Sequence, residues 1–150
     1  METKTAQSGI TELQGKYLQK FVGNWKIESK DSPMEYVTIK PLKNDLGVEV
    51  YAKWITTENM IILEAYGFWG YDREMDKIDI SMFLSDGNTI HCLGSFKSGN
   101  ELEFDEWSKT EPDLLIRTYH ILMNSDDNLY EIVTSLSDNL KEEYHWTRIN

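Results

Sequence analysis

Apolar and polar side chains alternate along most of this chain, which is the pattern of β-strands that have one buried face. Clear examples are the apolar sets Val48, Val50, Ala52, Trp54 and Ile78, Ile80, Met82, Leu84. Turn-forming sequences separate such runs at 44–47, 85–88, 98–100 and 125–128. Regular spacing of this kind is typical of a meander. The predicted strands, about ten in number, lie near residues 21–30, 34–42, 47–56, 60–71, 75–85, 89–97, 101–108, 113–124, 128–137 and 140–149.

One segment before these strands has a different period. Ile10, Leu13 and Tyr17 lie near helical spacing, and Gly15 interrupts the pattern, so the helix should be short. No long helix alternates with the strands, which disfavours a parallel α/β fold. We therefore expect an all-β protein with a tail and short helix over 1–17 and a single β-barrel domain over 18–150.

The two ends of the strand region carry residues that suit a closed sheet. Trp25 lies on the first predicted strand, in the sequence Gly23-Asn24-Trp25, and Arg148 lies on the last. Closure removes unpaired strand edges, so the sequence predicts a closed antiparallel meander barrel of roughly eight to ten strands. The Trp25 indole is expected to plug one end. The Arg148 guanidinium is expected to lie across that ring and to donate hydrogen bonds to nearby carbonyls.

These end motifs resemble the lipocalin/calycin superfamily. The resemblance rests on residues 18–25 (LQKFVGNW) together with Arg148. The sequence GFWGYD at 67–72 looks like the Gly-Tyr-Asp strand end of a bacterial lipocalin-like domain family of unassigned function. The resemblance covers about residues 18–149 and implies a calycin-like barrel with an internal pocket for a small hydrophobic molecule. It brings no catalytic motif.

Charge and composition limit the partners. The 150-residue chain has 26 acidic and 15 basic residues, and its net charge is −11. Such a surface repels nucleic-acid phosphates and anionic membranes, so neither is expected as a partner. Cys92 is the single cysteine, which excludes an internal disulfide. The first nine residues lack the apolar stretch of a secretory signal, so we expect a cytoplasmic protein, and the sequence leaves a homodimer open.

Strand parity predicts which side chains line the cavity. The expected lining is aromatic and flexible, which suits a flat, apolar ligand. The predicted ligand-binding residues are Trp54, Trp69, Tyr71, Met82, Phe104, Arg117, Tyr119, Tyr130 and Trp146. The alternative is that these side chains fill the barrel, as is common with eight strands.

Arg117 and Tyr119 are two apart on one predicted strand, so they point to the same side. Facing inward, they would clamp a carboxylate. Intracellular fatty-acid-binding barrels hold a carboxylate with an Arg-x-Tyr pair, but on the closing strand rather than two strands earlier. The alternative is an outward Arg117 paired with surface acids. The first hypothesis is therefore the binding of a small hydrophobic molecule, which could carry a carboxylate.

Catalytic candidates are few. Glu106 shares parity with Leu102 and Phe104 and could be a buried carboxyl group. The simpler alternative is a strand end or bulge that turns it to water. With His120, Glu106 is a candidate acid or base for a second hypothesis, a barrel enzyme of the cyclase or isomerase type. No nucleophile motif surrounds Cys92, which reads as a small strand hydrophobe.

The three histidines lie far apart in the sequence, without metal-ligand spacing, so no metal site and no cofactor are expected. Haem-binding calycin relatives carry a histidine near the chain end, which makes haem binding through His145 a third hypothesis. Haem ligation needs an inward imidazole. His91 and His145, however, alternate with the more apolar face and are expected outside.

Overall fold

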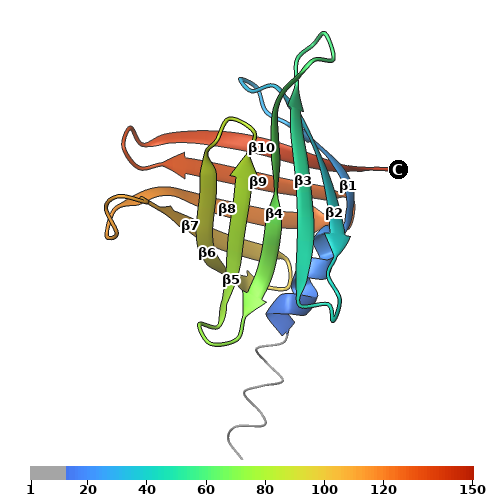
Figure 1. The fold of residues 1–150 in the computed structure, drawn as a ribbon. Coiled ribbons are helices and arrows are strands. Elements are labelled where there is room, and N and C mark those ends of the chain that lie inside the picture. The colour runs from blue at the N-terminus through green and yellow to red at the C-terminus, as the bar shows by residue number, and fades with distance from the viewer. Residues whose placement is uncertain (1–12) are drawn as a thin grey trace, which may run out of the picture.

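Ten antiparallel strands form a closed barrel in the computed structural model, which describes residues 13–150 (Figure 1). The strands are β1 (Gly23–Glu28), β2 (Met34–Pro41), β3 (Gly47–Ile55), β4 (Ile61–Asp72), β5 (Lys77–Leu84), β6 (Thr89–Ser98), β7 (Glu101–Trp107), β8 (Leu115–Ser125), β9 (Asn128–Ser135) and β10 (Leu140–Ile149). Each strand pairs with its neighbours in chain order, and β1 pairs with β10. The predicted closed meander barrel with a short N-terminal helix is confirmed.

A short helix closes one end of the barrel (Figure 1). Residues 13–18 are α-helical and continue into the 3-10 helix η1 (Gln19–Phe21). Lys20 Nζ donates to the carbonyl of Gly99 at 2.6 Å, and Gln19 Nε2 donates to the carbonyl of Gly47 at 3.2 Å. These bonds tie the helix to the β6–β7 and β2–β3 turns. The part of the expected helix at 10–12 lies outside the described residues, and the domain boundary at 17/18 stays a prediction.

The predicted contact between the two end strands is confirmed. Trp25 is fully buried and faces Arg148 across the β1–β10 pairing. The Arg148 guanidinium carbon lies 4.2 Å from the centre of the indole ring. Nη1 of Arg148 donates to the carbonyl of Val22 at 2.6 Å, and Nη2 donates to that of Lys20 at 3.1 Å. One side chain thereby links β10 to η1 and to the segment leading into β1.

Gly23 makes room for this guanidinium. Its φ of 137° is a backbone conformation that side chains with a Cβ rarely adopt. A Cβ at Gly23 would lie 2.3 Å from Nη1 of Arg148, which is far inside van der Waals contact. The glycine and the tryptophan of the Gly-Asn-Trp motif therefore serve one structural purpose at the closed end.

Aromatic side chains fill the barrel next to the helix. The ring of Trp146 lies 6.0 Å from that of Trp25, 6.2 Å from that of Phe21 and 6.5 Å from that of Trp69. Inward residues of β2, β3 and β5, such as Ile39 and Ile78, complete this apolar core. The alternating pattern in the sequence arises because one face of each strand packs here while the other meets water. Among the described helical residues, none forms a helix long and apolar enough to span a membrane.

Candidate ligand-binding cavity

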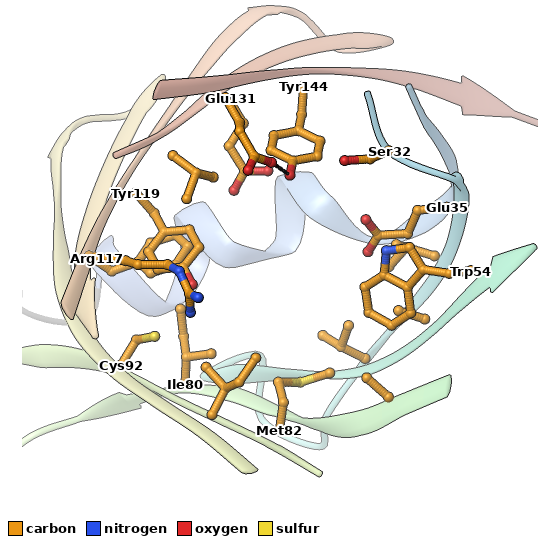
Figure 2. A pocket seen from close by; sticks show the side chains of 18 of the residues that line it. Ser32, Glu35, Trp54, Ile80, Met82, Cys92, Arg117, Tyr119, Glu131 and Tyr144 are labelled. Atoms are coloured by element: carbon orange, nitrogen blue, oxygen red, sulfur yellow. Dashed lines mark hydrogen bonds between the residues drawn. The ribbon is translucent and has the colours of Figure 1, made fainter. Parts of the chain in front are cut away.

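Beyond the aromatic core, the barrel encloses a cavity of about 430 Å³ (Figure 2). It reaches Ser32 and Pro33 of the β1–β2 loop, at the end of the barrel opposite the helix. Successive connections of a meander lie at alternate ends, so the β3–β4, β5–β6, β7–β8 and β9–β10 loops share this end. A cavity of this volume can hold one small organic molecule, as ligand-binding barrels do.

The greater part of the cavity wall is apolar. β3 to β7 each contribute inward side chains whose outward neighbours are polar or exposed. The apolar lining residues are Val37, Val50, Ala52, Trp54, Ala65, Trp69, Ile80, Met82, Leu84, Ile90, Phe104, Val133 and Trp146. The Trp69 indole N–H is buried and has no hydrogen-bond partner among the described residues.

Carboxyl groups gather on one side of this wall, which we call the acidic side and define as Glu35, Glu131 and Glu142. Glu35 lies on β2 opposite Trp54 of β3, whose indole N–H is directed at the carboxyl group (Figure 2). Glu131 of β9 accepts a hydrogen bond from Trp146 Nε1 at 3.2 Å and is 9% exposed.

Tyr144 completes the acidic side from β10. Its hydroxyl donates to Glu142, and Ser32 lies beside it (Figure 2). Burial, followed by the hydrogen bond to Glu142, raises the pKa of Tyr144 to about 12. The groups that face the acidic carboxyls are therefore neutral donors, namely two indoles and a phenol.

Burial shifts the acidity of two of these carboxyl groups. The pKa of Glu35 rises to about 8, first because the group is removed from water and then because Glu131 is negative. The pKa of Glu131 rises to about 7 through burial, against the opposing hydrogen bond from Trp146. Both carboxyls therefore exchange protons near neutral pH, where an ordinary glutamate is fully ionised.

The other side of the cavity holds a paired cation. Glu106, which is 8% exposed, accepts hydrogen bonds from Arg117 Nη1 at 3.2 Å and from the Tyr119 hydroxyl at 2.7 Å. The ring of Tyr119 stacks on that of Phe104 at 4.6 Å. Burial raises the pKa of Tyr119 and that of the nearby Cys92 thiol, so both stay protonated at neutral pH.

One comparison with a solved structure supports the fold. The crystal structure of Rv2717c from M. tuberculosis matches with a TM-score of 0.64 at 11% identity, over 89% of this chain and 95% of that chain. A redesigned β-barrel matches with a TM-score of 0.46 at 13% identity (90% and 96% covered), and a second one, bound to DFHBI, with 0.39 at 12% (89% and 99%). No protein-family model and no curated protein matches the chain. The likeness to Rv2717c shows a shared barrel fold, and membership of the lipocalin/calycin superfamily stays a prediction.

The structure brings most of the predicted ligand-binding residues to the cavity wall. Those that line it are Trp54, Trp69, Met82, Phe104, Arg117, Tyr119 and Trp146. Arg117 and Tyr119 point to the same side of β8, as their spacing predicted. That side is the inner face, so the alternative of an outward Arg117 is wrong. Their contact with a ligand stays a prediction.

Two residues of the predicted set lie outside the cavity, and the strand parity used was wrong for Tyr130 alone. On β9 the inner face belongs to Leu129, Glu131 and Val133, so Tyr130 points outward, and its ring lies 5.1 Å from that of His145. Tyr71 lies at the helix end of β4, outside the cavity, where its hydroxyl donates to Asp76 at 2.8 Å.

The candidate acid–base pair is separated by the barrel wall. Glu106 faces the interior, which its parity with Phe104 allowed, and the alternative that a strand end or bulge turns it to water is wrong. His120 lies on the outer face of β8, between the inward residues Tyr119 and Ile121, and cannot reach a substrate in the cavity. The prediction that His120 supplies a polar group inside the barrel is wrong because successive strand residues face opposite sides.

The haem hypothesis requires an inward histidine, and none of the three provides one. His91 bonds to Asp79 on the outside at 3.1 Å, and His145 is exposed beside Tyr130. With His120 on the outer face as well, no histidine can ligate an iron held in the cavity. The residues present do not fit a histidine-ligated haem.

Sequence reasoning missed the acidic side of the cavity. Glu35 has the parity of Val37 and Ile39, and Glu131 has that of Leu129 and Val133, so both carboxyls lie in apolar rows. That alternation was the available signal. Treating carboxylates as outward by default hides it, since a buried glutamate is the exception among strand residues.

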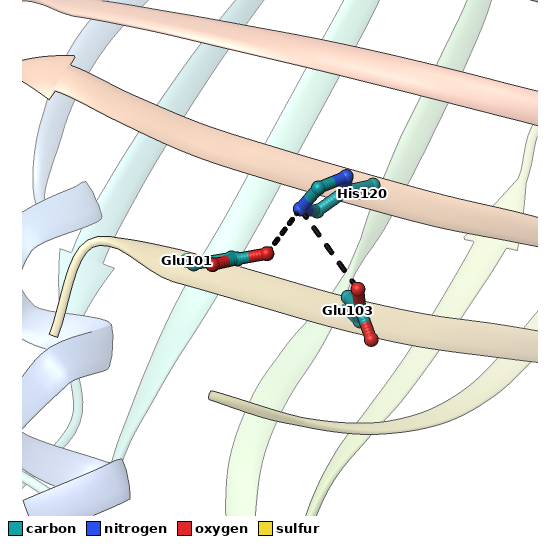
Figure 3. Close-up of side chains that lie close together, drawn as sticks. All are labelled: Glu101, Glu103 and His120. Atoms are coloured by element: carbon teal, nitrogen blue, oxygen red, sulfur yellow. Dashed lines mark hydrogen bonds and ion pairs between the residues drawn. The ribbon is translucent and has the colours of Figure 1, made fainter. Parts of the chain in front are cut away.

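Three potential metal ligands meet on the outer face (Figure 3). His120 Nε2 lies 2.7 Å from Glu101 Oε1 and 3.9 Å from Glu103 Oε1, and the three ligand atoms lie within 4.8 Å of one another. The register of β7 and β8 places them together, which their separation in the sequence concealed. Each side chain is partly exposed, and the hydrogen bond between His120 and Glu101 accounts for the arrangement.

Proposed function

We propose that this protein binds a small, largely apolar molecule inside the barrel. The observation that carries the proposal is the cavity of about 430 Å³ with an apolar wall at the end opposite the helix. Burying apolar ligand surface there contributes about 25 cal/mol per Å² before the costs of association. Trp54, Trp69 and Trp146 offer flat faces to an aromatic or alicyclic body.

Apolar residues around the open end support the same proposal. Met60, Ile61, Leu114 and Leu140 lie in or beside the loops at this end and are about half exposed or more. Exposed apolar side chains gathered around an opening are typical of a binding site. They give an apolar ligand a path from water into the cavity. The predicted cytoplasmic location and homodimer stay predictions.

A neutral fluorescent probe tests the proposal. N-phenyl-1-naphthylamine should bind with increased, blue-shifted emission, and it should quench the tryptophans of the cavity. The variant Ala52→Leu adds a side chain into the cavity and should abolish this signal, because Ala52 is a buried lining residue. Lys53→Leu, on the outer face of the same strand, is the matched control and should bind like the wild type. Equal binding by both variants would place the probe elsewhere and contradict the proposal.

One observation favours an enzyme as a second candidate. Glu35 and Glu131 share the cavity, and their pKa values lie near neutral, which is where a general acid or base works best. A cyclase or isomerase would then use these carboxyls in place of Glu106 and His120. This candidate is tested by incubating the protein with any small molecule that co-purifies with it. Conversion of that molecule is followed by mass spectrometry, and Glu35→Gln and Glu131→Gln serve as controls. Unchanged ligand after incubation would leave binding as the function.

A further inference from the structure

The charges inside the cavity are unequally matched. Arg117, the single cation among the lining residues, already pairs with Glu106 at 3.2 Å. Glu35 and Glu131 receive hydrogen bonds only from neutral indoles, and no lysine or arginine of the described chain forms an ion pair with either. The acidic side of the cavity therefore lacks a positive partner, whereas the basic group has its partner in place.

We propose that the ligand is an apolar molecule that carries an ammonium group, and that this group lies against the acidic side of the cavity formed by Glu35, Glu131 and Glu142. This inference rests on the proposed function and deepens it by naming the ligand class. A buried carboxylate without a counter-charge is costly, and a cation placed beside it removes that cost while gaining charge-assisted hydrogen bonds.

The same geometry disfavours the carboxylate that the Arg117–Tyr119 pair suggested. Both donors of that pair are directed at Oε1 of Glu106. A ligand carboxylate would have to displace this buried glutamate or share its donors, and it would add a negative charge to a cavity that already contains several carboxyl groups. Like charges brought together in a desolvated site repel strongly.

The apolar wall next to the acidic side suits the rest of such a ligand. The Trp54 indole lies beside Glu35, and both face the cavity (Figure 2). An ammonium ion over an indole face gains a cation–π attraction in addition to its ion pair. Met82 and Ile80 across the cavity contribute flexible apolar surface for the hydrocarbon part. An aromatic or alicyclic amine therefore matches both halves of the cavity.

Proton release should accompany binding. The titratable groups that face the cavity are Glu35 on β2, Cys92 on β6, Glu106 on β7, Arg117 and Tyr119 on β8, Glu131 on β9, and Glu142 and Tyr144 on β10. The raised pKa values of Cys92, Tyr119 and Tyr144 keep these groups protonated through neutral pH. An ammonium ion pairs with an ionised carboxylate, so amine affinity should increase as the pH rises through the pKa values of Glu131 and Glu35, near 7 and 8.

A matched series of naphthalene probes tests the inference by calorimetry. The probes are 2-naphthylmethylamine, 2-naphthalenemethanol and 2-naphthoic acid, which share a ring system and differ in charge. The amine should bind about tenfold tighter than the alcohol at about pH 8 and lose most of this advantage at about pH 6. The acid should bind more weakly than the alcohol.

Carboxamide variants assign the effect to the acidic side. Glu131→Gln and Glu35→Gln should each weaken amine binding by about tenfold and leave alcohol binding unchanged, which also shows that the variants are folded. The matched control is Glu143→Gln, since Glu143 is exposed on β10 next to Glu142 but faces outward.

The outcomes separate the two proposals. If the alcohol binds but the amine binds no tighter, or if both cavity variants bind the amine as tightly as the wild type does, the ligand class is wrong and the binding function stands. Tightest binding by the acid likewise overturns the ligand class and supports the Arg117–Tyr119 clamp. If none of the three probes binds, the binding function fails, and the ligand class fails with it.

Discussion

Replacing Glu131 by glutamine should make the protein more stable at alkaline pH. The side chain is 9% exposed, and burial raises its pKa to about 7 from an ordinary value of 4.5. The folded protein thus binds this proton more tightly than the unfolded chain does. The stabilisation that comes from this tighter proton binding is complete below about pH 4.5. It is lost as the pH rises through 7, because Glu131 then ionises inside the cavity.

The size of the effect follows from the pKa values. One pH unit corresponds to about 1.4 kcal/mol, so the interval between 4.5 and about 7 amounts to about 3 kcal/mol. Glutamine cannot ionise, and its carbonyl oxygen can still accept the hydrogen bond from Trp146. The unfolding free energy of Glu131→Gln minus that of the wild type should therefore increase by about 3 kcal/mol from about pH 5 to about pH 9.

Urea unfolding at the two pH values, followed by tryptophan fluorescence, measures this difference. The matched control is Glu111→Gln, which removes an exposed carboxyl group in the β7–β8 loop and should show no such pH-dependent gain. Equal stability differences between Glu131→Gln and wild type at both pH values would show that Glu131 is ionised in the folded state without cost. That result would refute the reasoning about an uncompensated acidic side.

Three further substitutions test the scaffold and the cavity wall. Arg148→Lys keeps the positive charge but loses the guanidinium hydrogen bonds to several carbonyls and the stacking on the Trp25 indole. Urea unfolding should therefore show an unfolding free energy lower by about 2–4 kcal/mol. A variant as stable as the wild type would contradict the role of the guanidinium. By calorimetry, Trp146→Phe should lower the unfolding free energy by about 1–3 kcal/mol more than Trp69→Phe does. The reason is that the Trp146 indole N–H donates to Glu131, whereas the Trp69 indole N–H has no acceptor among the described residues. Equal losses in the two variants would count against the Trp146–Glu131 hydrogen bond. Gly94→Ala should lower the melting temperature far more than Gly70→Ala does. A Cβ at Gly94 would lie 2.1 Å from a carbonyl oxygen of the neighbouring strand, whereas a Cβ at Gly70 would meet nothing within 4 Å. Similar melting temperatures of the two variants would contradict the close approach at Gly94.

The architecture was accessible from the sequence because it depends on local and terminal signals. Alternating apolar residues and turn sequences located all ten strands close to their observed bounds. Trp25 and Arg148 indicated closure, since a buried indole and a planar cation need each other at the joint between the first and last strands. These features depend on period, turn chemistry and position in the chain, all of which one sequence displays.

The chemistry of the cavity depends on contacts between strands, which the hydrophobic periodicity of the sequence does not reveal. Parity placed Arg117 and Tyr119 on one side of their strand but left open which face that was, and the pairing of Arg117 with Glu106 depends on the register of β7 and β8. Glu35 and Glu131 lie far apart in the chain, and only the closed barrel directs both at one space. The sequence by itself therefore determined a barrel and an apolar lining. The tertiary structure decided which charged groups of the cavity are paired and which have no charged partner among the described residues, because burial and pairing are properties of the assembled interior.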